Sequence, residues 1–339
     1  MLGCTISFCE ICVKQNAKHF SPMKHSLTKH LLLIVALAAT LAGCHTEPKQ
    51  QPQNSIYHWK STFCPDSTEL TILEEHNITR IYLKMFDVSV EQNHLSGIAE
   101  VVPIATTKFL SHIPKGVEIV PTAFITIEAL RAMAGKEAEF AELIVERMLA
   151  MCSYNKCGKI SELQLDCDWT ASTRHSYATL CEQAKGRLAE YGIELSITLR
   201  LHQLGETPPP ADRAVLMLYN TGAIKDPSTE NSILDIDNVR PYLKRSNNYP
   251  LPLSYAYPAF GWGVRFRGEE FVAITSENAE AADGETIRIE RPTIADILEV
   301  KTLVEERLGK PQGGNIIYHL DTKQLDYYTP NEITQILAY

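Results

Sequence analysis

The sequence lacks the short motifs of several large enzyme classes. It contains no glycine-rich phosphate loop, no tight group of metal ligands and no serine-histidine-aspartate arrangement. It also has no internal repeat and no long low-complexity tract, which argues against a repeat protein or a disordered chain. We therefore expect neither a cofactor nor a metal ion.

Basic residues are in the minority. The 339 residues include 32 Lys and Arg against 41 Asp and Glu, which gives a net charge of −9. The excess of acidic residues rises to 12 in residues 44–339. Such a charge balance disfavours contact with phosphate groups, so neither nucleic acid nor an anionic lipid surface is an expected partner.

A long apolar run occurs only near the amino terminus. Residues 23–43 begin with Lys24 and Lys29, continue through the apolar residues 31–39 and end in Leu-Ala-Gly before Cys44. A basic start, a short apolar stretch and small residues follow each other in this order in secretory signals. A transmembrane anchor is the alternative, but it needs about 20 apolar residues. The end of the segment resembles the sequence that lipoprotein signal peptidase recognises.

We therefore predict an exported bacterial lipoprotein, cleaved before Cys44 and tethered to a membrane by lipid on that cysteine. Residues 1–22 have no apolar run of their own and are expected to lie upstream of the true start at Met23. Residues 44–54 are polar and contain two prolines, which predicts a short tether. Because no acidic run follows Cys44, we expect a periplasm-facing position in the cell envelope.

Five cysteines follow the predicted lipidated residue. An oxidising envelope permits a bridge between Cys152 and Cys157, and buried free thiols are the alternative. Because the number is odd, at least one thiol stays free. Cys9 and Cys12, further upstream, have no second pair of ligands at a spacing that suits zinc.

Residues 55–339 are long enough for one large domain. Short runs of β-branched and aromatic residues alternate with helical patterns, as in parallel strands that are joined by helices. The expected strands are Ser55–Trp59, Thr79–Phe86, Glu118–Ile125, Ile160–Trp169, Glu194–Arg200, Arg213–Asn220, Leu251–Tyr257 and Asn315–Asp321. Eight strands in this alternation predict a (β/α)8 TIM barrel.

Three of the connecting helices are readable from their patterns and ends. One covers Glu137–Met151, a second runs from Ser172 until Gly192 stops it, and a third begins at Thr293, which can cap it. Residues 260–292, between the seventh strand and the third helix, are an expected insertion with a hairpin-like stretch and an acidic loop. Insertions after a strand belong to the active face of a barrel.

The fourth expected strand carries two carboxylates on one face. Because side chains alternate along a strand, Gln164, Asp166 and Asp168 face one side and the apolar residues between them face the other. In a barrel the polar set faces the interior, where a carboxylate is costly unless it is paired or functional. We predict Asp166 and Asp168 as catalytic candidates. The alternative is a buried network in which Lys84 or Arg200 pairs with one of them.

The sixth expected strand adds a second motif, Met217-Leu218-Tyr219-Asn220. Together the two strands resemble the chitinase-type glycoside hydrolases of family eighteen. That family carries Asp-x-x-Asp-x-Asp-x-Glu on strand four, and Met-x-Tyr followed by Asp or Asn on strand six. The matching residues are Asp166, Asp168, Trp169, Met217, Tyr219 and Asn220. The resemblance implies a barrel that binds or processes a glycan.

Two positions depart from the strand-four motif. Leu163 stands in place of its first Asp, and Thr170 stands in place of the catalytic Glu. The family's acid protonates the glycosidic oxygen, which threonine cannot do. Strand three also lacks the family's Ser-x-Gly-Gly. Two alternatives follow: a glycan-active enzyme that uses Asp168 as acid or orienting group, and a non-catalytic glycan-binding or scaffold lipoprotein that lost the acid.

The chain also resembles a bacterial lipoprotein family whose barrels share a Tyr-Leu-Lys, a Gln-x-Asp-x-Asp and a Ser-Ile-Thr strand. These motifs stand here at residues 82–84, 164–168 and 196–198. This resemblance implies a glycosidase-like barrel with Lys84 beside the two aspartates at its mouth.

The seventh strand and the residues after it are aromatic, with Tyr255, Tyr257 and Trp262. Aromatic rings give a sugar a flat apolar platform, and ordinary core packing is the alternative. The predicted substrate-binding residues are Lys84, Gln164, Arg200, Tyr219, Asn220, Tyr255, Tyr257 and Trp262.

Three further residues with titratable side chains lie near strand ends. Asp87 follows the second strand, and Asp321, at the end of the eighth, could complete a catalytic pair, although a solvated loop residue is the simpler interpretation. A lone histidine such as His319 is expected to bond within the protein instead of binding a metal.

Overall fold

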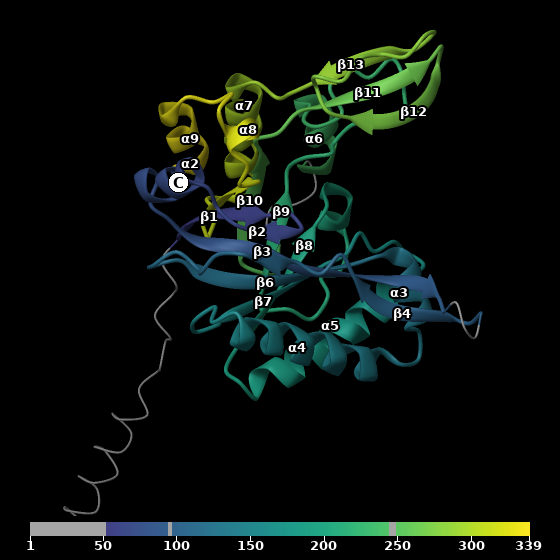
Figure 1. Ribbon diagram of the computed structural model, residues 1–339, viewed down its shortest axis with the longest axis vertical. Coiled ribbons are helices and arrows are strands. Elements are labelled where there is room, and N and C mark those ends of the chain that lie inside the picture. Colours follow the sequence, from purple (N-terminus) through teal and green to yellow (C-terminus); the bar gives the residue numbers. More distant parts are fainter. Residues whose placement is uncertain (1–51, 94–96, 244–248) are drawn as a thin grey trace, which may run out of the picture. The chain divides into compact units, whose positions relative to one another are not determined.

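The computed structural model describes residues 52–93, 97–243 and 249–339, which belong to one compact unit. The predicted signal, Cys44 and most of the tether lie outside the described residues. Eight parallel strands close into a barrel because the first of them pairs with both the last and the second (Figure 1). They are β1 (Asn54–His58), β3 (Ile78–Gln92), β6 (Glu118–Ile125), β7 (Glu162–Asp166), β8 (Glu194–Leu199), β9 (Arg213–Met217), β10 (Leu253–Pro258) and β14 (Asn315–Tyr318).

The predicted TIM barrel is confirmed, and each of the eight expected strands overlaps one barrel strand. Helices follow most strands and cover the outside of the barrel (Figure 1). They are α2 (Ser67–Glu75), α3 (Ile127–Ala132), α4 (Glu137–Tyr154), α5 (Arg174–Ala189), the 3-10 helix η1 (Leu201–Gly205), α6 (Ile236–Leu243), α7 (Ile294–Leu308), α8 (Thr322–Leu325) and α9 (Pro330–Leu337).

All three predicted helices are present, and local features of the sequence explain where two of them begin or end. Thr293 caps α7 in a reciprocal arrangement with Asp296, in which each side chain accepts a hydrogen bond from the other's backbone N–H. The stretch after α5 ends at Gly192, whose φ of +67° is accessible to glycine at little cost. Helix α4 begins at the expected residue and runs three residues further than predicted.

Strand β7 shows the predicted alternation. Leu165 faces the helices, where its carbonyl accepts a hydrogen bond from the hydroxyl of Tyr177 on α5 at 3.1 Å. Trp169, beyond the strand, stacks on the same Tyr177. Gln164 faces the barrel interior, where its side-chain oxygen accepts a hydrogen bond from the Tyr57 hydroxyl at 2.8 Å. The inward polar set therefore follows directly from the strand period.

Two insertions project from the barrel. After β10, the strands β11 (Trp262–Arg267), β12 (Glu270–Thr275) and β13 (Thr286–Glu290) form an antiparallel sheet at the top of Figure 1. Strand β3 continues past its predicted end and folds back as β4 (Ala99–Ile104). The first insertion was predicted, whereas the second was not. A short pair, β2 (Thr62–Phe63) and β5 (Lys108–Phe109), completes the sheets of the described residues.

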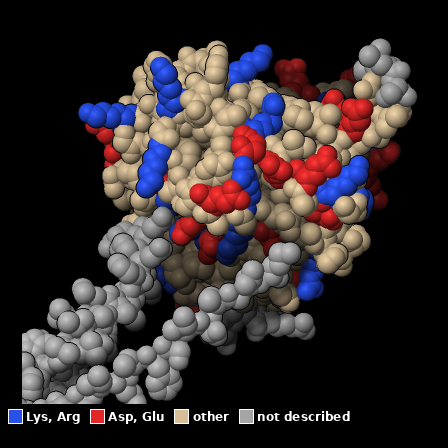
Figure 2. Space-filling view, turned by 90° about the horizontal axis from the view of Figure 1, so that it is seen from below, with Lys and Arg blue, Asp and Glu red and all other residues tan. Residues whose placement is uncertain are grey.

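The described cysteines are free. Cys152 and Cys157 are both buried as thiols near the end of α4 and form no bridge. The alternative, in which all five thiols are buried, holds for four of them, because Cys64 is exposed. Among the helices of the described ranges, none is long and apolar enough to cross a membrane. Acidic and basic side chains are interspersed on the face shown in Figure 2.

An ion network joins the first residues of several barrel strands. Arg80 of β3 is 3 % exposed and donates to Glu118 of β6 at 2.9 and 3.0 Å and to Glu162 of β7 at 3.2 Å. Arg213 of β9 lies 3.6 Å from Glu162 and also pairs with Glu194 of β8. The amino end of the barrel is therefore closed by paired charges, of which Arg80 and Glu162 are buried.

We predict that Arg80→Met lowers the free energy of unfolding by about 3–5 kcal/mol, because it leaves the carboxylate of Glu162 buried with a weaker partner. A urea titration measures this loss. The matched control is Arg131→Met, whose exposed pair with Glu128 is 4.0 Å long and should contribute less than about 1 kcal/mol. Equal losses in the two variants would contradict a stabilising role for the network.

Candidate functional site

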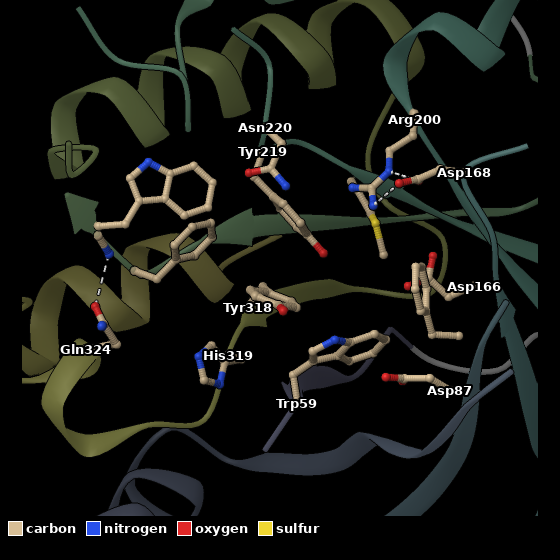
Figure 3. Close-up of a pocket in the computed structure, with 15 residues that line it drawn as sticks. Trp59, Asp87, Asp166, Asp168, Arg200, Tyr219, Asn220, Tyr318, His319 and Gln324 are labelled. Atoms are coloured by element: carbon tan, nitrogen blue, oxygen red, sulfur yellow. Dashed lines mark hydrogen bonds and ion pairs between the residues drawn. The ribbon is translucent and has the colours of Figure 1, made fainter. Parts of the chain in front are cut away.

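A cavity of about 450 Å³ lies at the carboxyl end of the barrel strands (Figure 3). Ligand pockets of proteins commonly have this size, and barrel enzymes place their sites at this end. The cavity is lined by Trp59, Asp87, Phe124, Asp166, Asp168, Arg200, Met217, Tyr219, Asn220, Phe260, Gly261, Trp262, Tyr318, His319 and Gln324. Six of the ten predicted catalytic and substrate-binding residues therefore meet here: Asp166, Asp168, Arg200, Tyr219, Asn220 and Trp262.

Asp168 and Arg200 form a two-point ion pair at the wall of the cavity. The guanidinium donates from Nε to Oδ1 of the carboxylate and from Nη2 to Oδ2, the latter at 3.2 Å. This parallel arrangement is the strong form of an Arg–carboxylate contact. Of the two predicted partners, Arg200 is thus the one that pairs with a strand-four aspartate. Both oxygens of Asp168 are occupied, although its side chain is 45 % exposed.

Asp166 lies deeper and is bonded differently. It is 2 % exposed, and its Oδ1 accepts a hydrogen bond of 2.6 Å from the Thr198 hydroxyl. Burial raises the pKa of this carboxyl to about 6, and the charges of Asp168 and Asp87 act in the same direction against the lowering effect of Arg200. Asp166 can therefore exchange a proton under mildly acidic conditions.

The third carboxylate of the cavity, Asp87, enters it because strand β3 is irregular. The pairing of β3 with β6 shifts register between Lys84 and Phe86, so the regular alternation is broken there. Phe86 packs outside, under the guanidinium of Arg147 at 5.1 Å, and Asp87 lines the cavity. Lys84 forms an ion pair of 3.1 Å with Asp87.

Aromatic rings form a continuous wall around Tyr318. The Tyr219 ring lies 4.9 Å from it, the Phe260 ring 5.5 Å and the Trp59 ring 6.0 Å, measured between centroids. Trp262 extends the wall, 5.4 Å from Phe260, and its indole N–H donates to Glu290 at 3.0 Å. The wall offers apolar ring surface next to the polar groups of strands β7 to β9.

Several polar atoms of the cavity have no partner among the described residues. They are the Tyr219 hydroxyl, Nη1 of Arg200 and Nδ1 of His319. Burial lowers the pKa of His319 to about 4, so its ring is neutral at pH 7. Unpaired polar groups are costly in a buried site, and a bound ligand with complementary groups removes that cost.

Four predicted binding residues do not line the cavity. Lys84 contacts Asp87 and lies 5.8 Å from the Trp59 ring, one layer behind the wall. Gln164 is fully buried beneath Asp166, where its side chain bonds Tyr57. The prediction that these two residues contact a substrate is corrected: both belong to the interior layer that supports the site.

Tyr255 and Tyr257 face the helices instead of the cavity. The Tyr255 hydroxyl donates to the carbonyl of Gly309 at the end of α7, at 2.8 Å. The ammonium of Lys301, on α7, lies 5.8 Å from the Tyr257 ring centroid. Ala256, which pairs in register with Met217, is the inward residue of β10. The platform prediction is therefore wrong for both tyrosines, and core packing explains them.

The sequence did not identify Trp59, Phe260 and Tyr318 as site residues. Each stands at or just beyond the carboxyl end of a barrel strand, as Tyr219 does. Aromatic residues at strand ends were thus an available signal. Asp321, in contrast, caps α8 and lies 3.5 Å from Lys60, outside the cavity lining.

Thr170 is exposed and lies in the loop after β7. It occupies the position at which the family-eighteen motif has its glutamate. Its hydroxyl lies 3.0 Å from that of Ser172, and its backbone N–H donates to the hydroxyl of Thr173. It is not among the cavity-lining residues. A second cavity, of about 270 Å³, adjoins the first across Asp168 and Arg200.

Within the described ranges, no group of three or more acidic, histidine or cysteine side chains could hold a metal ion. The residues that line the main cavity can bind a ligand with both polar and apolar groups, and Asp166 can exchange a proton with it.

Solved structures with the same fold include a spore cortex-lytic enzyme and chitinases. The spore cortex-lytic enzyme SleL of Bacillus cereus has a TM-score of 0.52 and 14% identity, and covers 85% of this chain and 74% of its own. The chitinase of Chromobacterium violaceum has a TM-score of 0.52 and 13% identity, with 85% and 99% covered. The GH18 chitinase ChiB of Flavobacterium johnsoniae has a TM-score of 0.52 and 11% identity, with 85% and 94% covered.

No family model and no curated protein sequence matches the chain. At these low identities the structural likeness establishes the fold. The chain therefore shares the TIM-barrel fold of these structures, and the predicted distant similarity to family-eighteen barrels is confirmed at the level of the fold.

We predict that Asp166 titrates near pH 6 and that Arg200→Met moves this titration upward, because the guanidinium stabilises the ionised form. Carbon-13 NMR of the Asp166 carboxyl, assigned by its loss in Asp166→Asn, measures both values. Since the pKa is higher in the folded state than the ordinary value of 3.8, the folded protein binds more protons between pH 4 and 6. The Asp166 contribution to stability therefore falls as the pH rises through this window. A midpoint below pH 4.5 would contradict the assignment.

Proposed function

We propose that this protein is a lipoprotein of the bacterial cell envelope whose barrel binds a carbohydrate without cleaving it. The observation that carries the proposal is the cavity itself. It combines a wall of aromatic rings with polar atoms that lack partners in the described part of the chain, at the end of the barrel where ligands bind.

A sugar matches this combination of surfaces. Its ring faces are apolar and stack on aromatic side chains, and its hydroxyl groups both donate and accept hydrogen bonds. The Tyr219 hydroxyl and Nη1 of Arg200, which have no partner within the described ranges, are groups that a sugar hydroxyl could meet. The printed names of the solved structures support the same ligand class, since they include chitinases and a spore cortex-lytic enzyme.

Binding without hydrolysis is favoured by the state of the carboxyl groups. Asp168 is bound at both oxygens by Arg200 and is not placed to deliver a proton. Thr170 cannot act as an acid and does not line the cavity. Hydrolysis with Asp166 as the acid is the second candidate, because its pKa of about 6 suits a group that donates a proton.

We predict that calorimetry detects binding of short β-linked glycans, and that Trp59→Ala weakens it about tenfold because one ring of the wall is removed. The matched control is Tyr154→Ala, since Tyr154 is 87 % exposed and does not line this cavity. An intact protein that binds no member of an array of envelope and dietary glycans would refute the proposed function.

The same samples separate binding from cleavage. Chromatography of the glycans after long incubation should show no product from the unaltered protein. Product that disappears in Asp166→Asn would instead establish the second candidate, with Asp166 as the acid.

The envelope location rests on residues 23–44 of the sequence. We predict that the protein fractionates with membranes and that Cys44→Ala leaves it uncleaved, because the predicted cleavage site ends in this cysteine. Mass spectrometry of the amino-terminal peptide measures the lipid directly. Cys64→Ala is the control, since Cys64 is an exposed thiol of the barrel domain. A membrane fraction without lipid on Cys44 would contradict the anchor.

A further inference from the structure

Carboxylates outnumber cations around the main cavity. Asp87, Asp166 and Asp168 line it, and the cationic side chains bound to them are Lys84, which lies behind Asp87, and Arg200. His319 adds no charge at neutral pH, because burial lowers its pKa to about 4. With all three carboxyls ionised, this cluster therefore has one negative charge in excess.

Asp166 is the carboxylate without a cation of its own. The Arg200 guanidinium is held by both oxygens of Asp168, and Lys84 is held by Asp87. Thr198 donates to Oδ1 of Asp166, while Oδ2 makes no hydrogen bond within the described part of the chain. A buried carboxylate in this state favours a ligand that brings hydrogen-bond donors and positive charge.

The aromatic wall favours the same kind of ligand. The face of an aromatic ring attracts a cation, most strongly where water is excluded. Trp59, Tyr219 and Tyr318 surround the space in front of Asp166 (Figure 3). The hydroxyl of Tyr219, which is 4 % exposed, has no partner among the described residues and can accept a hydrogen bond.

We propose that the sugar bound in this cavity carries a free, protonated amino group, which Asp166 binds in front of the aromatic wall. The inference rests on the proposed function and narrows it to glycans with de-N-acetylated amino sugars. An ammonium group supplies three donors and the missing positive charge.

Two other sugar chemistries fit less well. An N-acetylated amino sugar brings a neutral amide and leaves the excess charge of the cavity uncompensated. An acidic sugar adds a carboxylate to three that are already present, and Asp168 already neutralises the Arg200 guanidinium, of which only Nη1 lacks a partner among the described residues.

Binding of such an ammonium should also remove a proton from Asp166. Burial and the neighbouring carboxylates raise the pKa of Asp166 to about 6, so about half of the free protein carries this proton at pH 6. A bound cation stabilises the ionised form and lowers the pKa. Binding of an amino sugar whose amine is already protonated at pH 6 should therefore release up to about half a proton per site.

The experiment compares three tetrasaccharides by calorimetry at pH 6. They are β-1,4-linked glucosamine, its fully N-acetylated counterpart and the corresponding glucose oligomer. We expect the glucosamine oligomer to bind at least about tenfold more tightly than either of the others. Repeating the titration in buffers of different ionisation enthalpy measures the proton release of the unaltered protein.

Asp166→Asn should reduce the preference for the free amine to less than about twofold and abolish the proton release. Glu128→Gln removes one exposed negative charge outside the cavity lining and should leave both unchanged. Equal affinity for all three oligomers would overturn this inference and leave the proposed function in place. Absence of binding by any glycan would count against both, and a preference that survives Asp166→Asn would overturn the role of Asp166.

Discussion

Closure of the barrel is the constraint on which the site depends. Strand β1 pairs with β14 on one side and with β3 on the other, so residues at the two ends of the chain become neighbours. Trp59 follows β1 and Tyr318 ends β14, and their rings meet at 6.0 Å. The same closure brings Asp166 of β7 opposite this pair across the cavity. A wall built from both ends of the sequence exists only when all eight strands are in place.

Much of this architecture could be predicted from local patterns. The eight strands follow from alternating apolar runs, and the inward position of Asp166 and Asp168 follows from the period of two. The pairing of Asp168 with Arg200 was one of two alternatives, and only the structure decides between them. Lys84 stands at the register level of Thr122 and Gln164, below the cavity, and reaches upward to Asp87.

The remaining differences have two physical causes. The irregularity between Lys84 and Phe86 reverses the alternation, which is how Asp87 enters the site while Phe86 leaves it. No sequence pattern marked that position. Strand β10 differs because nearly all of its residues are apolar. The sequence therefore does not show which of the two alternating sets of side chains faces the barrel interior. Tyr255 and Tyr257 belong to the set that faces outward, and they pack under α7. Inference from alternation is therefore weakest in strands that are apolar on both faces.

The paired charges of Arg80, Glu118 and Glu162 have a consequence for how this barrel can change over time. These ion pairs join the strands at the amino end of the barrel. A layer of buried side chains separates the ion pairs from the cavity. Substitutions of residues that line the cavity therefore leave the ion pairs at the other end of the barrel unchanged. The residues that line the cavity can therefore be exchanged, and with them the chemistry of the site, while the scaffold stays folded.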